Sequence, residues 1–385
     1  TLKSGYPNEG APAFITGGKR NVEDVFKNIK AQPTNFEADD PGDVIQYIAA
    51  HDNLTLFDVI AQSIKKDPAI AANNQEIHRR LRLGNLMVLT SQGTPFLHSG
   101  QEYGRTKQFR DPAYKYTVSE DKVPNKSHLL TNADGTPFEY PYFIHDSYDS
   151  SDAVNHFDWT KATNGDKFPE NTKSRDYVKG LIALRKSTDA FTRKTKAEVD
   201  QNVTLITQPG KDGVEKEDTV LGYQVVASNG DIYAVFVNAD SKERKFNFGE
   251  AYKHLANAQV VADGNTAGVT AISNPAGVTL GADGVTLAPL TATILRIQKN
   301  SKPNQEKPKE EQNQTKPSTP KGESGQTTTS STQSNTSASQ TQQQQAGAGK
   351  ADKTLPSTGT TISIAGVLAG IGLLLSSVVV LKKKK

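Results

Sequence analysis

The sequence predicts an α/β fold over residues 1–190 and an antiparallel, all-β fold over residues 191–298. Three observations lead to this prediction. Strand-like apolar runs alternate with helical patterns in the first part, and short strands of alternating apolar and polar residues fill the second part. A long polar segment then begins near Lys299, where the composition changes.

Strands and helices alternate through the first 190 residues. Asp43–Ala50 reads as an apolar strand, and a helical stretch follows near Leu56–Lys66. A second helix is predicted over Glu76–Ser91. Thr94–Gly100 reads as another short strand, and a final helix near Arg175–Lys186 comes after a long loop. This order is the alternation of βα units.

Both predicted strands of this part end in polar clusters. His51-Asp52-Asn53 follows the first strand, and a cluster that begins at His98 ends the second. In a (β/α)8 barrel, polar residues at the carboxyl ends of the strands line the active site. Such a barrel typically needs about 250 residues, whereas residues 1–190 supply only two convincing βα units. We therefore predict the C-terminal portion of a barrel, in a chain that is processed or partial.

Residues 191–298 read as an antiparallel β-sandwich. Apolar residues alternate with polar ones in short runs, and Asn229-Gly230 is a strong hairpin signal between two of them. No catalytic side chains converge here, so we interpret this part as an accessory domain. The predicted strands are Val203–Gln208, Val220–Ser228, Ile232–Asp240, Lys245–Gly249, Val278–Leu280 and Ala292–Gln298.

The composition excludes several classes of function. The chain has 45 basic and 42 acidic residues and a net charge of +3, so charge gives no reason to expect nucleic acid as a partner. It has no cysteine, which excludes a disulfide framework and a thiolate metal site. The Asp-rich stretch Asp146–Asp152 lacks the spacing of an EF-hand loop. We therefore assign no metal, and no cofactor is evident.

The C-terminal part has three segments in a fixed order. Residues 299–354 are rich in Gln, Ser, Thr, Lys, Pro and Gly, which predicts a disordered linker. Residues 355–385 contain the sequence LPSTG, an apolar run over Ile362–Leu381 of the length that crosses a bilayer as a helix, and a final run of lysines. A simple tail anchor is the alternative, but the order, spacing and charge of the three elements favour a sorting signal.

This tail resembles the cell-wall sorting signal of Gram-positive surface proteins. The resemblance implies that a sortase recognises Leu355, Pro356, Thr358 and Gly359, cleaves the Thr358–Gly359 bond and joins Thr358 to peptidoglycan. The apolar helix is then discarded, so the chain meets the membrane only transiently before sorting. We therefore expect a secreted protein that is covalently anchored to the cell wall of a Gram-positive bacterium by a wall-spanning linker.

Three stretches resemble the C-terminal part of the catalytic domain of type I pullulanases, which are retaining α-glycoside hydrolases of the α-amylase superfamily. They are YIAAHDNLTLFD (Tyr47–Asp58), QGTPFLHSGQEYGRTK (Gln92–Lys107) and DSYDSSDAVNHFDW (Asp146–Trp159). The match covers about residues 40–190, and the β-part with its wall anchor fits the streptococcal surface type. The resemblance implies hydrolysis of α-1,6-glucosidic bonds in pullulan, glycogen and branched dextrins, with α-glucan as the partner.

The resemblance also assigns roles to individual residues. Asp52 matches the third catalytic carboxylate of the family, which stabilises the transition state, and His51 matches the neighbour that hydrogen-bonds sugar hydroxyls. We expect Asn53, His98 and Tyr148 to contribute to substrate binding. The alternatives are an Asn/Asp turn that closes a strand, a packed histidine at position 98 and a packed aromatic ring at position 148.

A retaining glycosidase needs a carboxylate nucleophile and a carboxylic acid about 5–5.5 Å apart. No stretch of this chain matches either of these family motifs, so we expect the chain alone to be inactive and to act within a full-length enzyme, where calcium binding stays open. Phe57 stands where many relatives carry tryptophan, and Trp159 is expected in the core. Two other functions stay open: a wall-tethered, α-glucan-binding adhesin, and α-1,4 cleavage within the same superfamily.

Overall fold

The computed structural model describes residues 1–299, with the exception of residues 6–7 and 149. The predicted linker, apart from Lys299, the LPSTG sequence and the apolar run over Ile362–Leu381 lie outside the described residues. Within the part that is described, no helix combines the length and the apolar character needed to cross a membrane.

A parallel pair of short strands organises the N-terminal part. β2 (Ile45–Gln46) lies beside β3 (Thr94–Pro95), with Ile45 opposite Thr94, and α2 (Leu56–Ile64) and α3 (Ala71–Thr90) connect them. This confirms the predicted order of strands and helices. Both strands are shorter than predicted, since the last hydrogen bond between them joins Phe96 N to Gln46 O.

Capping and burial explain the helices of this part. Thr55 caps the N-terminus of α2, because its side-chain oxygen accepts a hydrogen bond from Asp58 N at 3.2 Å. α3 is buried over most of the length between Ile77 and Thr90. α6 (Pro169–Lys186), which begins with proline in its first turn, packs along α3. All three predicted helices are therefore confirmed. α2 begins at the predicted residue, whereas α3 and α6 each begin several residues earlier than the pattern indicated.

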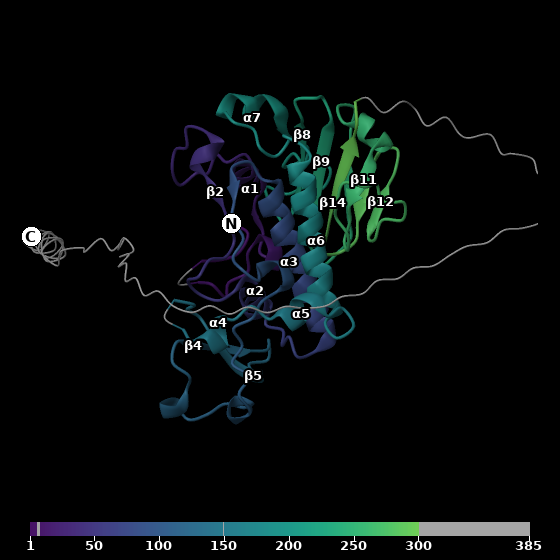
Figure 1. Cartoon of the computed structure of the whole chain (residues 1–385). Helices are drawn as coiled ribbons and strands as arrows, with labels where there is room; N and C mark the ends of the chain where they lie inside the picture. The colour runs from purple at the N-terminus through teal and green to yellow at the C-terminus, as the bar shows by residue number, and fades with distance from the viewer. Residues whose placement is uncertain (6–7, 149, 300–385) are drawn as a thin grey trace, which may run out of the picture. The chain divides into compact units, whose positions relative to one another are not determined.

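Five antiparallel strands form the main sheet of the C-terminal part, in the order β11-β14-β9-β8-β6. Figure 1 shows β8, β9 and β14 beside α3 and α6. Asn229-Gly230 turns the chain between β8 and β9, as predicted, with Gly230 at a φ of 85°. The five strands are β6 (Val203–Leu205), β8 (Val220–Val226), β9 (Ile232–Asn238), β11 (Gln259–Ala262) and β14 (Thr291–Ile297).

Both faces of this sheet are covered, and its central strands are accordingly apolar on both sides. On one face, Tyr223 Oη donates to Thr90 Oγ1 of α3 at 2.6 Å. On the other face, the ring of Phe236 lies 5.3 Å from that of Phe246 in a second sheet. Helices and a second layer of strands therefore enclose the main sheet. The second sheet has the order β10-β13-β12 and consists of β10 (Arg244–Asn247), β13 (Gly284–Leu287) and β12 (Val278–Leu280).

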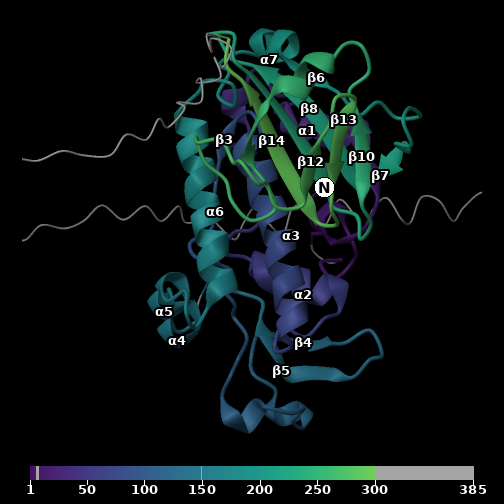
Figure 2. The same cartoon turned by 90° about the vertical axis from the view of Figure 1, so that its right-hand side faces the viewer.

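Several elements were not predicted. Figures 1 and 2 show the hairpin β4–β5 near α4 and α5, at the end of α2 and α6 that points away from the sheets. The full set of unpredicted helices and strands is β1 (Arg20–Asn21), α1 (Val22–Ile29), β4 (Ser127–Thr131), β5 (Pro137–Ile144), α4 (Asp152–Asn155), α5 (Trp159–Thr163), α7 (Lys196–Asn202), β7 (Glu217–Asp218), β11 and β13.

One apolar core runs through both predicted parts of the described chain. Phe26 of α1 lies 6.3 Å from Tyr223 of β8, and Phe191 lies 5.6 Å from Tyr233 of β9, measured between ring centroids. Contacts therefore cross the boundary predicted at residue 190. That boundary and the others in the chain stay predictions.

Candidate active site

The polar cluster that follows β2 lies on an exposed loop. His51 Nδ1 lies 3.1 Å from Asp52 Oδ1, and the Asp52 side chain is 71% exposed. Asn53 has a φ of 63°, a left-handed conformation that asparagine tolerates better than most residues. It turns the chain toward Thr55, which caps α2. The loop therefore presents a carboxylate and an imidazole to solvent instead of burying them.

A second loop lies against this cluster. Ser147 N donates a hydrogen bond to His51 O at 3.0 Å. The ring of Tyr148 lies 6.4 Å from the imidazole of His51, and Tyr148 is 73% exposed. The two stretches are almost a hundred positions apart in the sequence, and both belong to the motifs that carried the resemblance. The structure thus brings His51, Asp52 and Tyr148 into one neighbourhood.

Lys107, which was not among the predicted site residues, joins the two loops. Its Nζ donates to Asn53 O at 2.6 Å and to Ser147 Oγ at 3.0 Å, and the residue is only 2% exposed. Burial lowers the pKa of Lys107 to about 8, and the nearby Asp58 carboxylate partly offsets this effect. A signal was present in the sequence, because Lys107 ends the second stretch that resembles pullulanases.

Asp58 holds the backbone of Lys107 in place through a hydrogen bond. Its carboxylate is fully buried and accepts hydrogen bonds from Lys107 N at 2.8 Å and from Thr106 Oγ1. Burial raises the pKa of Asp58, and these hydrogen bonds oppose that change. The first turn of α2 is thus tied to the segment that carries Lys107. The Asp52 loop, which immediately precedes α2, is held at both ends.

His98 lies at the edge of this arrangement and is half-buried. Its Nε2 is 3.3 Å from Nη2 of Arg105, whose Nη1 donates to Asn155 O at 3.0 Å. Burial, together with the positive charge of Arg105, lowers the pKa of His98 to about 4. The imidazole is therefore neutral at pH 7, and its contact with Arg105 uses one ring nitrogen as an acceptor.

Trp159 contradicts the expectation of a core position. It is 70% exposed, and its ring packs on Phe157 with 4.5 Å between the centroids. Trp159 occupies the first turn of α5, a helix that was not predicted, and this turn faces solvent. Phe57, in contrast, is buried and contacts the ring of His78 at 5.3 Å.

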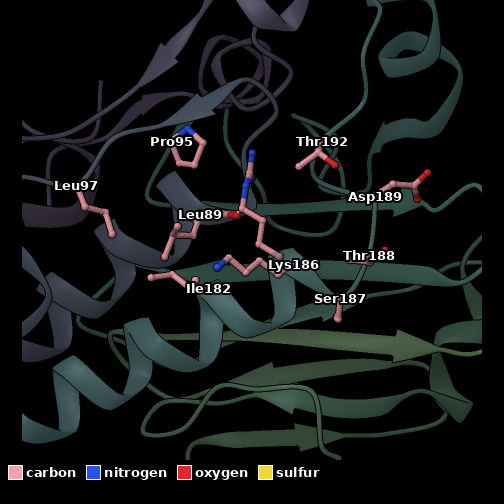
Figure 3. Close-up of a pocket in the computed structure, with 10 residues that line it drawn as sticks. Leu89, Pro95, Leu97, Ile182, Lys186, Ser187, Thr188, Asp189 and Thr192 are labelled. Carbon is pink, nitrogen blue, oxygen red and sulfur yellow. The ribbon is translucent and has the colours of Figure 1, made fainter.

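A separate cavity of about 790 Å³ lies between β3 and the C-terminal ends of α3 and α6 (Figure 3). Leu89, Leu97 and Ile182 supply its apolar lining, and Lys186 and Asp189 lie at its edge. None of the predicted site residues lines this cavity. Among the described residues, no group of three or more His, Asp and Glu side chains is arranged to hold a metal ion.

Comparison with known proteins defines the class to which the chain is similar. Residues 202–298 match the family described as SpuA C-terminal, and residues 349–385 match the LPXTG cell wall anchor motif. The motif marks a secreted protein that is anchored to the cell wall, as predicted. The chain is also similar to streptococcal proteins named pullulanases, and the resemblance to this group is confirmed.

Relatives of this chain come from Streptococcus and from Bacillus. Pullulanase A of Streptococcus pneumoniae serotype 2 is 73% identical over 299 residues, which cover 78% of this chain and 24% of that protein. The pullulanase of Bacillus subtilis is 27% identical over 202 residues. The chain thus spans about a quarter of the length of the curated relatives named here.

Solved structures show the same relationship. The catalytic module of the multi-modular, glycogen-degrading pneumococcal virulence factor SpuA is 72% identical, with a TM-score of 0.76 over 78% of this chain and 42% of that structure. The pullulanase SAP of Group B Streptococcus is 59% identical, with a TM-score of 0.74 over 77% of this chain and 38% of that structure. The described residues therefore have a mixed helix and sheet fold that matches part of each of these structures.

Proposed function

We propose that the chain is part of a cell-wall-anchored pullulanase that hydrolyses α-1,6-glucosidic bonds in pullulan, glycogen and branched dextrins. The observation that carries this proposal is the exposed His51–Asp52 pair, held on its loop by Lys107, in a chain 73% identical to pullulanase A. In this proposal the loop binds α-glucan, and the side chains that contact the sugar are those of His51, Asn53, His98 and Tyr148.

The chemistry of a retaining glycosidase gives Asp52 a specific task. The transition state is an oxocarbenium-like sugar, whose hydroxyl groups donate stronger hydrogen bonds as positive charge develops on the ring. An ionised Asp52 accepts such hydrogen bonds, and His51 Nδ1, 3.1 Å from Asp52 Oδ1, orients the carboxylate. A group that is already in place before the reaction stabilises the transition state without reorganisation.

The nucleophile and the general acid come from other parts of a full-length protein in this proposal. A retaining mechanism needs both groups about 5–5.5 Å apart, and neither family motif occurs in the sequence of this chain. We therefore expect Asp52 to act with two carboxyl groups from outside the chain. The 385-residue chain by itself then binds glucan without cleaving it.

The fold that we propose for this chain is the C-terminal portion of a (β/α)8 barrel followed by a β-sandwich. The parallel pair β2–β3 supports the barrel, since Ile45 on β2, and Tyr47 and Phe96 directly after the two strands, are large apolar side chains left exposed. Further strands of a barrel would bury them. Contact between Phe236 and Phe246 supports a sandwich of the two antiparallel sheets.

Attachment to the wall completes the proposal. A sortase cleaves between Thr358 and Gly359, and residues 299–354 then span the wall as a linker between the enzyme and peptidoglycan. The apolar run over Ile362–Leu381 holds the chain at the membrane only until that cleavage. The substrate is therefore met outside the cell.

Product analysis tests the proposed bond specificity. The full-length protein is incubated with pullulan, and the released oligosaccharides are separated by chromatography. Maltotriose is the expected product, because pullulan joins maltotriose units through α-1,6 bonds. Panose as the main product would contradict the proposal and favour α-1,4 cleavage. The 385-residue chain, assayed in parallel, is expected to release no sugar.

A further inference from the structure

The aromatic cluster around Trp159 lies outside the arrangement of His51 and Asp52. Trp159 is the only tryptophan of the chain and is 70% exposed in the first turn of α5. Its ring packs on Phe157 at 4.5 Å, and Phe157 packs on the buried ring of Tyr103 at 4.8 Å, measured between centroids. The planes of the first pair are tilted by 49° and those of the second by 73°, so the three rings form a stack of tilted and edge-to-face contacts that runs from the interior to the surface.

Hydrogen bonds hold this stack in place. Asp158, between the two outer rings, donates its backbone N–H to Tyr103 Oη at 3.0 Å. Its side-chain Oδ1 accepts a hydrogen bond from Lys161 N, also at 3.0 Å, and so caps α5. The indole is therefore presented by a rigid backbone, which lowers the entropic cost of ligand binding.

A polar cavity of about 280 Å³ adjoins the inner end of the stack at Tyr103, and neither Phe157 nor Trp159 is among its lining residues. Tyr103, Asp158 and Lys161 line it, and so does Arg105, whose side chain is almost completely buried. The cavity is large enough for a single sugar ring, and its walls offer both hydrogen-bond donors and acceptors. A flat aromatic face next to such groups is the usual composition of a carbohydrate site, because a pyranose has an apolar C–H face and a rim of hydroxyls.

The stack also continues the candidate active site along the chain. Ser147 contacts His51, and Asn155, which accepts a hydrogen bond from Arg105, donates its side-chain amide to Ser147 O at 2.7 Å. The segment from residue 146 to 159 therefore runs from the Asp52 loop to Trp159. A glucan chain that reaches Asp52 could extend along this segment.

We propose that Trp159 and Phe157 form a second binding surface for α-glucan, on which one sugar ring stacks while its hydroxyls contact Asp158 and Lys161. The identity of the ligand rests on the proposed function. The role of this surface is to retain a long chain near the site rather than to take part in bond cleavage. It is therefore more important for polymers than for short oligosaccharides.

The single tryptophan makes the proposal directly testable in the unaltered 385-residue chain. Glycogen and maltotetraose are titrated into the chain, and the tryptophan emission is recorded. A saturable change in intensity with a shift to shorter wavelength is expected, since a stacked sugar removes water from the indole. Emission that stays constant while affinity electrophoresis shows glycogen binding would overturn the proposal.

A pair of variants separates the surface from the rest of the molecule. In gels that contain glycogen, Trp159→Ala is expected to bind at least about tenfold more weakly than the unaltered chain. Tyr116→Ala, which removes an equally exposed ring elsewhere, should bind as the unaltered chain does. Equal retardation of the Trp159→Ala and unaltered chains would contradict the proposal.

Hydrolysis by the full-length protein distinguishes this inference from the proposed function. Trp159→Ala is expected to raise KM for glycogen while leaving kcat on maltotriosyl substrates within about twofold. Loss of kcat on the short substrates would show a role in the reaction itself and would overturn the retention role. If the unaltered full-length protein cleaves no α-1,6 bond, the proposed function fails, whereas the emission experiment still reports on the surface.

Discussion

Lys107 Nζ lies 2.6 Å from the backbone carbonyl oxygen of Asn53, next to the carboxylate assigned to transition-state stabilisation. The same ammonium group donates to Ser147 Oγ, so one buried cation connects the two loops that surround Asp52. Lys107 contacts neither Asp52 nor His51 through a hydrogen bond of its side chain, and we therefore treat it as a positioning residue. Three of the following experiments use this relationship or its support.

Removal of the Lys107 cation is expected to impair catalysis more than binding. Lys107→Met keeps the length of the side chain and removes both hydrogen bonds, so the Asp52 loop loses its anchor. Displacement of a catalytic group by about 1 Å costs on the order of 10²-fold in rate. We expect kcat of the full-length protein on pullulan to fall by about this factor. Lys122→Met, on the surface, is the matched control, and equal rates for both variants would contradict the positioning role.

Deprotonation of Lys107 should affect activity and stability in opposite directions as the pH rises. Its pKa of about 8 in the folded chain is lower than the value of 10.5 in the unfolded chain. Between these two values the unfolded chain binds more protons, so the contribution of Lys107 to stability increases with pH. Activity should instead decline above pH 8, because the neutral amine donates weaker hydrogen bonds.

Parallel measurements check this divergence. Denaturant midpoints and kcat are recorded between pH 7 and 10 for the unaltered protein and for Lys107→Arg, which keeps its charge throughout this range. The variant is expected to lose the decline in kcat that is centred near pH 8 in the unaltered protein. An identical alkaline decline in both proteins would assign it to another group.

Removal of the Asp58 carboxylate is expected to destabilise the fold. Asp58→Ala leaves Lys107 N and Thr106 Oγ1 without their acceptor in a fully buried position. An unsatisfied buried donor costs about 1–3 kcal/mol, so we expect a loss of roughly 2–5 kcal/mol for the two together. Urea denaturation measures this loss. Asp121→Ala on the surface is the control, and a comparable midpoint for both variants would argue against the buried network.

The packing on the face of the main sheet that the second sheet covers is tested at Gly222, the cross-strand partner of Phe236. A Cβ atom at this position would lie 2.7 Å from Cδ1 of Phe236. Gly222→Ala should therefore destabilise the chain by about 1–3 kcal/mol, the usual cost of overpacking. The added change Phe236→Leu should recover part of this loss. Gly42→Ala, which meets no atom within 4 Å, serves as the control. Full stability of Gly222→Ala would contradict the described packing.

Local patterns in the sequence predicted the elements that make most of their contacts within one strand pair or one helix. β8 and β9 have long apolar runs on either side of Asn229-Gly230, and both were predicted. β13 was missed because its four residues, Gly284–Leu287, carry little pattern and are held by pairing with β10 and β12. Short strands of this kind depend on tertiary contacts more than on propensity.

In the candidate site, too, the residues that carry a local sequence signal were predicted, and those that depend on tertiary contacts were not. His51 and Asp52 were predicted from their position after an apolar run and from the family motif, and the structure places Tyr148 beside them. The role of Lys107 could not be predicted, since its partners Asn53 and Ser147 are 54 and 40 positions away. Trp159 was placed in the core as a hydrophobic anchor, whereas its exposure depends on how α5 packs against α6.

The Asp52→Asn variant of the full-length protein gives the most direct test of the central claim. The amide is equal in size to the carboxylate but lacks its charge, so folding should be unchanged while the transition state loses its stabilising acceptor. We expect kcat on pullulan to fall by about 10²–10³-fold, with Asp121→Asn fully active. Normal pullulan hydrolysis by Asp52→Asn would contradict the role of this carboxylate.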